Sequence, residues 1–296
     1  MSALSRVLAR LAERRVRASV DEAAPVAPAV SRREEVGVES FLPGGVLENA
    51  YGRVYLHERL RSEIERPTNK WGRYPSKPST RAFLHDDLSP FATLGCAGTV
   101  FFDLETCGLS NAPLFLAGTM HWNGSDYVVR QYFARHYGEE AALVDELARF
   151  LAGFETVISY NGKSYDVPFL ADRASLHHVP FERPARHVDL VHHARRRWAG
   201  VYPDCRLITL EMHVCQRRRS GDIPSAEVPG LYHDYVRNGG AHRLIPVFHH
   251  NLLDVTTMDE ILRALVGDPP PPVCEEELPI YDADPEEEEV YPFRNG

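Results

Sequence analysis

Two acidic residues at the end of an apolar segment are the clearest chemical signal in this chain. Residues 99 to 104 read TVFFDL, which is typical of a buried strand, and Asp103 is followed two residues later by Glu105. Because side chains alternate along a strand, both carboxylates point to the same side, where Gly108 lets the chain turn away. Like charges side by side are costly unless a cation lies between them, and Mg²⁺ or Mn²⁺ prefers oxygen ligands. The pair predicts a divalent-metal site; for a bare D-x-E, an exposed strand end with two acids is the alternative.

A second segment, SYNGKSYD, follows a predicted strand at residues 156 to 160. The Asn161-Gly162 dipeptide predicts a turn, and Asp166 falls in the first turn of the next predicted helix. Asp166 is therefore a third acidic candidate. Asn161 either contacts substrate or only makes the turn, and Lys163 is either a phosphate ligand or a solvated side chain.

The third segment, FHHNLLDV, enters a predicted helix late in the chain. His250 and Asp254 are separated by four residues and share a face of that helix, whereas His249 lies about 140° round from Asp254. A histidine one turn from a metal ligand can orient or deprotonate an attacking water near neutral pH. Spacing favours His250 for this role, with His249 as the alternative.

These segments require a mixed α/β framework to bring them together. Apolar runs predict three strands in succession, a helix, a fourth strand and a second helix, in the order βββαβα, followed by three more helices. The predicted strands cover residues 99–104, 114–122, 126–134 and 156–160, and the predicted helices cover 139–151, 164–176, 188–198, 206–215 and 247–266.

Composition divides the chain into four parts. We expect a basic N-terminal arm and linker at residues 1–35, an irregular lead-in layer packed on the domain at 36–95, the catalytic domain at 96–267 and a Pro-rich acidic tail at 268–296. The tail is too polar to fold alone and is predicted to be disordered.

Charge and cysteine content narrow the class of protein. Ten of the 42 acidic residues but one of the 33 basic residues lie in the tail, so the body carries 32 of each sign and the net charge of −9 does not oppose a polyanionic partner. The five cysteines form no CxxC pair, which indicates a reducing compartment. Without a secretory signal or a run of about 20 apolar residues, the chain is expected to be cytoplasmic, with no membrane partner.

Together, D-x-E-T, Y-N-G-K-S-Y-D and the late H-N-x-x-D resemble the DEDD superfamily of 3′–5′ exonucleases on the ribonuclease H-like fold. More narrowly, the chain is similar to the YprB-type ribonuclease H-like group, with supporting segments HVDL, LITLE, DIP and VPGLY in the same order. The resemblance covers roughly residues 97 to 265. It implies a ribonuclease H-like mixed β-sheet flanked by helices.

The resemblance also implies residue roles and a mechanism. Asp103, Glu105, Asp166 and Asp254 would bind two Mg²⁺ or Mn²⁺ ions about 4 Å apart, and His250 or His249 would handle the nucleophilic water. The expected partner is the 3′ end of single-stranded DNA or RNA, with no obligate protein partner. The residues expected to bind this substrate are Thr106, Asn161, Lys163 and Tyr165.

Two other functions fit the same fold. One is a catalytically silent module that binds nucleic acid, against which the presence of all four carboxylates argues. The other is a ribonuclease H-type endonuclease, in which the late histidine is less expected. Sugar discrimination depends on contacts to the 2′ hydroxyl, so the motifs do not separate DNA from RNA.

Overall fold

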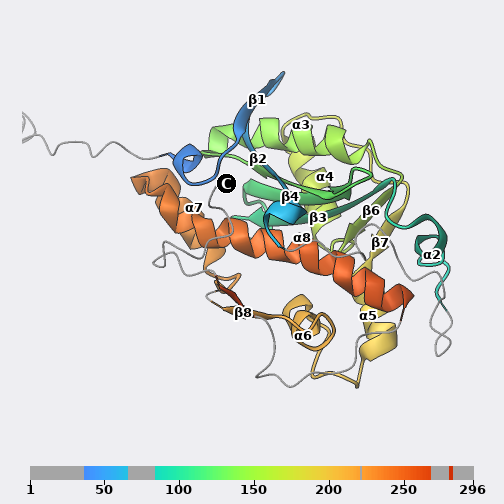
Figure 1. Cartoon of the computed structure of the whole chain (residues 1–296). Coiled ribbons are helices and arrows are strands. Elements are labelled where there is room, and N and C mark those ends of the chain that lie inside the picture. Colours follow the sequence, from blue (N-terminus) through green and yellow to red (C-terminus); the bar gives the residue numbers. More distant parts are fainter. Residues whose placement is uncertain (1–36, 66–83, 221, 268–279, 283–296) are drawn as a thin grey trace, which may run out of the picture. The chain divides into compact units, whose positions relative to one another are not determined.

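A computed structural model describes residues 37–65, 84–220, 222–267 and 280–282 (Figure 1). Seven strands form one sheet in the order β1-β2-β5-β4-β3-β6-β7. The pairs from β1 to β3 are antiparallel, and β3-β6 and β6-β7 are parallel. The strands are β1 Gly45–Asn49, β2 Gly52–Leu60, β3 Thr99–Thr106, β4 Leu114–Trp122, β5 Tyr127–Phe133, β6 Thr156–Ser159 and β7 His187–Asp189.

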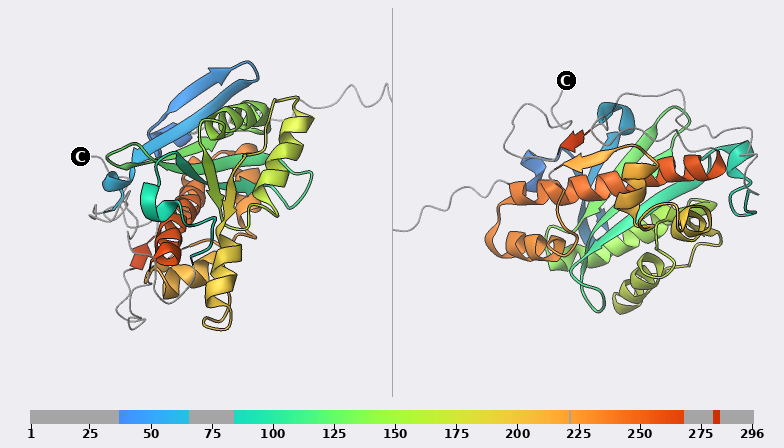
Figure 2. Two further views of the ribbon diagram at one scale, coloured as in Figure 1. Left: turned by 90° about the vertical axis from the view of Figure 1, so that its right-hand side faces the viewer. Right: turned by 90° about the horizontal axis from the view of Figure 1, so that it is seen from below.

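Helices cover both faces of this sheet (Figures 1 and 2). One face packs against α3 and α4, and the other packs against the long helix α8, on which α5 and α6 pack in turn. The helices are α2 Phe91–Leu94, α3 Glu140–Leu151, α4 Asp166–Leu176, α5 Leu190–Trp198, α6 Leu207–His213, α7 Val228–Asn238 and α8 Ile245–Val266, with short 3-10 turns at η1 Val38–Ser40, η2 Arg61–Glu63, η3 Tyr137–Glu139 and η4 Ala241–Leu244. The predicted mixed α/β fold is confirmed.

Strand β3 separates apolar from acidic side chains by simple alternation. Val100, Phe102 and Leu104 point toward α3 and α4, where they are buried in one core cluster. The intervening positions point toward α8, and the first of them, Phe101, is buried in the second cluster. Asp103 and Glu105 continue this second register, so both carboxylates face α8.

The lead-in segment differs from its predicted form. The expectation of irregular structure over residues 36 to 95 is wrong for residues 45 to 60, because β1 and β2 form a hairpin that extends the sheet. Charged residues such as Glu48 and Arg53, which pair across the hairpin, interrupt its apolar alternation. Charged residues are typical of edge strands, where they discourage pairing with other chains, and here they hid the strand signal.

Most other elements agree with the sequence prediction. The strands β3 to β6 and the helices α3, α4, α6 and α8 lie within a few residues of the expected ranges. The predicted helix at 188–198 begins instead at Leu190, after the short strand β7, and helix α7 was not expected.

The terminal segments lie largely outside the described residues. The predicted N-terminal arm and linker fall there entirely, as does all of the acidic tail except β9, Ile280–Asp282, which pairs in parallel with β8, Arg218–Ser220. None of the helices in the described ranges is both long and apolar enough to cross a bilayer.

Candidate active site

Strand β3 and helix α8 bring three predicted site residues together. Ligand atoms of Glu105, His250 and Asp254 lie within 4.8 Å of one another. Nε2 of His250 is 3.5 Å from Oδ2 of Asp254 and 4.0 Å from Oε1 of Glu105. His250 and Asp254 meet because residues four apart lie on one face of a helix, as the spacing predicted.

Asp103 is held in place from α8 by an amide. Nδ2 of Asn251 donates to Oδ2 of Asp103 at 3.0 Å, and Oδ1 of Asn251 accepts from Gln131 at 3.0 Å. Asn251 fits only because Gly118 pairs with Asp103 across the sheet. A Cβ at Gly118 would lie 2.1 Å from Oδ1 of Asn251.

Asp166, the fourth carboxylate, comes from the first residue of α4. Its side chain is buried and accepts the backbone N–H of Leu104, which ties α4 to β3 beside the other two acids. The preceding turn has Asn161 at a φ of +67°, as the Asn-Gly dipeptide predicts. Gly162 is required next, because a Cβ there would come 2.3 Å from Oγ of Ser159 and 2.8 Å from Oδ2 of Asp166.

Asp189 fixes this turn from the neighbouring strand. Its buried carboxylate accepts the backbone N–H groups of Asn161 at 2.7 Å and Lys163 at 2.9 Å. It also caps α5 by accepting the N–H of Val191. Asp189 therefore supports the position of Asp166 and acts through the backbone.

The carboxylates repel one another in the absence of a counter-ion. Burial, followed by the charges of its acidic neighbours, raises the pKa of Asp103 well above its ordinary value. The pKa of Glu105 rises for the same reasons. Burial raises the pKa of Asp166 to about 7, with Asp189 and Asp254 adding to the effect. The site holds more negative charge than its protein surroundings balance.

His250 is held by a second carboxylate on its other nitrogen. Nδ1 lies 2.8 Å from Oδ1 of Asp222, which leaves Nε2 directed at Glu105 and Asp254. Burial acts to lower the pKa of His250, but Asp254 and Asp222 outweigh it and raise the pKa to about 9. His249 is also buried on α8 but does not belong to this ligand group, so the geometry favours His250 of the two candidates.

A buried arginine pairs with the carboxylates from the side. The side chain of Arg219 is 3% exposed and contacts Asp254 at 2.6 Å, Glu211 at 2.5 Å and Asp222 at 3.3 Å. It leaves Oδ2 of Asp254 directed at His250. Arg219 therefore partly neutralises the site and braces the segment that carries Asp222.

The predicted substrate-binding residues occupy two settings. Oγ1 of Thr106 lies 2.7 Å from the hydroxyl of Tyr165, and both hydroxyls lie within hydrogen-bond distance of the carbonyl oxygen of Gly108. This pair joins the end of β3 to the start of α4. Asn161 and Lys163 are exposed on the turn before Asp166.

Sequence reasoning missed three residues that shape this site. Asn251 holds Asp103, Asp222 holds His250, and Arg219 contacts Asp254. Asn251 and Asp222 lie in the H-N-x-x-D and D-I-P segments noted in the sequence, but nothing in their spacing indicates which acid or imidazole they contact.

The donor set fits hard divalent cations. Glu105, His250 and Asp254 form one ligand group, and the carboxylates of Asp103 and Asp166 lie near enough to interact electrostatically with it. Oxygen-rich sites of this kind suit Mg²⁺ or Mn²⁺. Burial and mutual repulsion raise the pKa values of these carboxylates. Bound cations would restore these groups to their ionised form.

Comparisons with known proteins identify the family of the chain. A family model described as the RNase H superfamily matches residues 100–266. The uncharacterized protein YprB of Bacillus subtilis strain 168 is 32% identical over 165 residues, which cover 53% of this chain and 39% of YprB. Among solved structures, the family B DNA polymerase of the hyperthermophilic archaeon Pyrobaculum calidifontis aligns with a TM-score of 0.45 and 16% identity, over 56% of this chain and 24% of the polymerase.

The matched region includes all four carboxylates and His250, and the family model spans more than half of the chain. The chain therefore belongs to the RNase H superfamily and is a YprB-type ribonuclease H-like protein.

Proposed function

We propose that this protein is a metal-dependent 3′–5′ exonuclease that hydrolyses phosphodiester bonds of nucleic acid. The observation that carries the proposal is the convergence of Asp103, Glu105, Asp166 and Asp254 beside His250. So many carboxylates rarely lie together where their role is only structural, since each one raises the free-energy cost of ionising the others. The late histidine, one turn before Asp254, favours an exonuclease over a ribonuclease H-type endonuclease.

The four carboxylates would hold two Mg²⁺ or Mn²⁺ ions. When bound, such ions activate water and stabilise the charge that develops on a leaving oxygen. The protein supplies rigid geometry for them: the Asn251 amide orients Asp103, and the Leu104 N–H orients Asp166. Two divalent cations would neutralise the four negative charges, so that a phosphodiester could approach.

His250 would hold or accept a proton at Nε2, the nitrogen that faces Glu105 and Asp254. Asp222 fixes the ring by its contact with Nδ1, so it acts as a positioning residue. An imidazole held in this way can orient a nucleophilic water beside the carboxylates.

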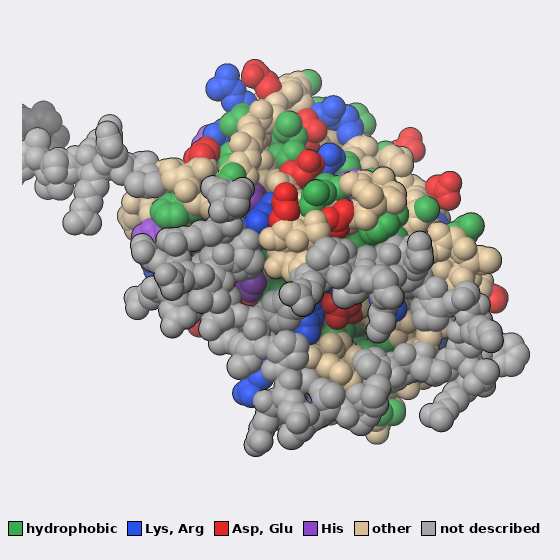
Figure 3. Space-filling model, in the orientation of Figure 1, with side chains coloured by type: hydrophobic (Ala, Val, Ile, Leu, Met, Phe, Trp, Pro, Cys, Tyr) green, Lys and Arg blue, Asp and Glu red, His purple; other side chains and the backbone are tan. Residues whose placement is uncertain are grey.

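Substrate contacts would come from the turn before α4. Lys163 is exposed there and can reach a phosphate, and Asn161 can donate to a base or sugar. On the face drawn in Figure 3, the basic and acidic side chains that the structure describes are interspersed. On this face, attraction of the polyanion would then depend on the bound cations and on such local contacts.

The test separates catalysis from binding. Wild-type protein and Asp254→Asn are incubated with labelled single-stranded DNA, RNA and an RNA–DNA hybrid in Mg²⁺, Mn²⁺ or EDTA, and both cleavage and filter binding are measured. We expect metal-dependent cleavage by the wild type and its loss in Asp254→Asn, with binding retained. Asp172→Asn is the matched control, because Asp172 is an exposed acid on α4.

Two results would contradict the proposal. Binding without cleavage by the wild type in every metal would indicate the silent binding module. Internal cuts confined to the hybrid would indicate a ribonuclease H-type endonuclease.

A further inference from the structure

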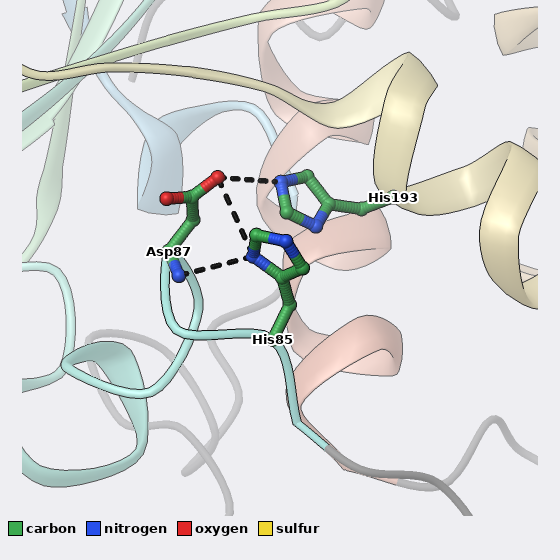
Figure 4. A group of neighbouring side chains, drawn as sticks. All are labelled: His85, Asp87 and His193. Atoms are coloured by element: carbon green, nitrogen blue, oxygen red, sulfur yellow. Dashed lines mark hydrogen bonds and ion pairs between the residues drawn. The ribbon is translucent and has the colours of Figure 1, made fainter.

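A second group of metal-ligating side chains lies outside the carboxylate site (Figure 4). His85 and Asp87 come from the segment before α2, and His193 comes from α5. Oδ2 of Asp87 is 3.4 Å from Nδ1 of His85 and 3.5 Å from Nε2 of His193. One ligand atom from each residue lies within 4.8 Å of the other two. None of the functions proposed above uses these residues.

The separations are close to those of a tetrahedral zinc site. Zn–N and Zn–O bonds of about 2.0–2.1 Å place neighbouring ligand atoms about 3.3–3.4 Å apart. The two distances from Asp87 are 3.4 and 3.5 Å, so they already match this value. The third pair of ligand atoms, those of His85 and His193, must also come to this distance. The side chain of His85 is 43% exposed, which leaves it room to move.

Two of the three ligands are already held in place. His193 is buried, with 4% of its side chain exposed, and its Nε2 is directed at Asp87. Nη2 of Arg186 donates to the backbone carbonyl of Asp87 at 2.7 Å, and Leu88, the next residue, is buried in the core. The ligand segment is therefore anchored to the domain at Asp87 and at the residue that follows it.

The nitrogen of His85 that lies nearest Asp87 can bind a metal. Nδ1 of His85 accepts the backbone N–H of Asp87 at 3.2 Å, so it has a lone pair, and a metal would replace this long hydrogen bond.

We propose that His85, Asp87 and His193 form a binding site for a zinc-class transition-metal ion, with water as the fourth ligand. Two imidazoles and one carboxylate select Zn²⁺ over Mg²⁺, which requires oxygen ligands. The exposed side of His85 and Asp87 provides the entry path and the position for water.

The bound ion would fasten two segments that are distant in the sequence. It would join the segment before α2 to α5, whose N-terminal cap is Asp189. Asp189 also holds the turn that leads to Asp166. The ion would therefore stabilise α5 and, through Asp189, the turn before Asp166, without contacting substrate.

The test uses the full-length chain carrying Asp103→Asn and Asp254→Asn, which weakens metal binding at the carboxylate site. Zn²⁺ affinity is measured by calorimetry, and Co²⁺ is used as a visible probe because tetrahedral nitrogen and oxygen ligands give it strong absorption. We expect one Zn²⁺ per chain and a tetrahedral Co²⁺ spectrum. His85→Ala and His193→Ala should each weaken Zn²⁺ binding by at least about 10- to 100-fold, since even the loss of a group that only supports a ligand has that effect.

Matched controls keep the outcome clear. His192 and Asp86 are exposed neighbours of the ligands, so His192→Ala and Asp86→Asn should bind Zn²⁺ as the parent does. The exposed His85 can be replaced without disturbing the core, which keeps the test valid if His193→Ala does not fold. Equal affinities in His85→Ala and the controls, or no Zn²⁺ binding by the parent, would overturn the proposal. Neither result depends on nuclease activity, so it leaves the proposed function untouched.

Discussion

Replacing Asp166 by asparagine should stabilise the metal-free protein. The substitution keeps the shape of the side chain and an oxygen that can accept the Leu104 N–H. It removes a buried negative charge that lies beside other carboxylates. A catalytic acid that can be replaced with a gain in stability is a sign that the site is built to hold a cation.

The magnitude follows from the pKa of Asp166. Burial and the neighbouring acids raise this pKa from 3.8 to about 7. At 1.36 kcal/mol per pH unit, the ionised group lowers the free energy of unfolding by up to about 4 kcal/mol above pH 7. Asparagine loses part of the hydrogen bonding, so we expect a gain of about 2–4 kcal/mol, or roughly 5–15 °C in Tm.

The sign of the pH dependence is opposite to that of a salt-bridged acid. Because the folded pKa of Asp166 is raised, the destabilisation is complete above pH 7 and disappears as the pH falls toward 3.8. At pH 5 the difference between the variant and the wild type should be less than half of its value at pH 8.

The assay is thermal and urea unfolding in EDTA at pH 8 and pH 5. Asp172→Asn, on the exposed side of the same helix, should change stability little at either pH. Added Mn²⁺ should stabilise the wild type and have less effect on Asp166→Asn. A variant that is less stable than the wild type at pH 8 in EDTA would refute the reasoning.

Three further predictions test individual contacts. Asp222→Asn should lower kcat by about 10-fold or more, because His250 loses the carboxylate that holds its ring. The same carboxylate raises the pKa of His250, so the rise of the pH–rate profile should shift to lower pH than in the wild type. Gly118→Ala should lower the free energy of unfolding by about 1–3 kcal/mol, because its Cβ would displace Asn251, whereas Gly230→Ala on α7 meets open space and should stabilise by about 0.5–1 kcal/mol. Glu140→Gln should lower the free energy of unfolding by about 3–5 kcal/mol at pH 7, because it leaves the buried charge of Arg173 on α4 without its carboxylate partner. The pKa of Glu140 is lowered despite its burial, so this difference should shrink in unfolding experiments as the pH falls below 4.5.

Local periodicity was sufficient to predict much of the site. Alternation along β3 placed Asp103 and Glu105 on one face, and the four-residue spacing on α8 placed His250 beside Asp254. Asp189 could be expected as a helix cap, since it immediately precedes an apolar helical pattern.

The remaining contacts depend on tertiary packing. Arg219 lies in the short strand β8 and Asp222 in the irregular segment after it. Their partners lie on α6 and α8, so these contacts have no signal in local spacing. The same holds for Asp87 and His193, which are more than 100 residues apart in the sequence. The β1-β2 hairpin was missed because charged edge residues masked its period of two.

The most direct test of the central claim is the time course of cleavage of a 5′-labelled oligonucleotide by wild type and Asp103→Asn in Mn²⁺. The account predicts a ladder of products shortened stepwise from a free 3′ end, no reaction when that end is blocked or EDTA is present, and no ladder with Asp103→Asn. Cleavage that persists in Asp103→Asn would contradict the claim that these carboxylates form the catalytic site.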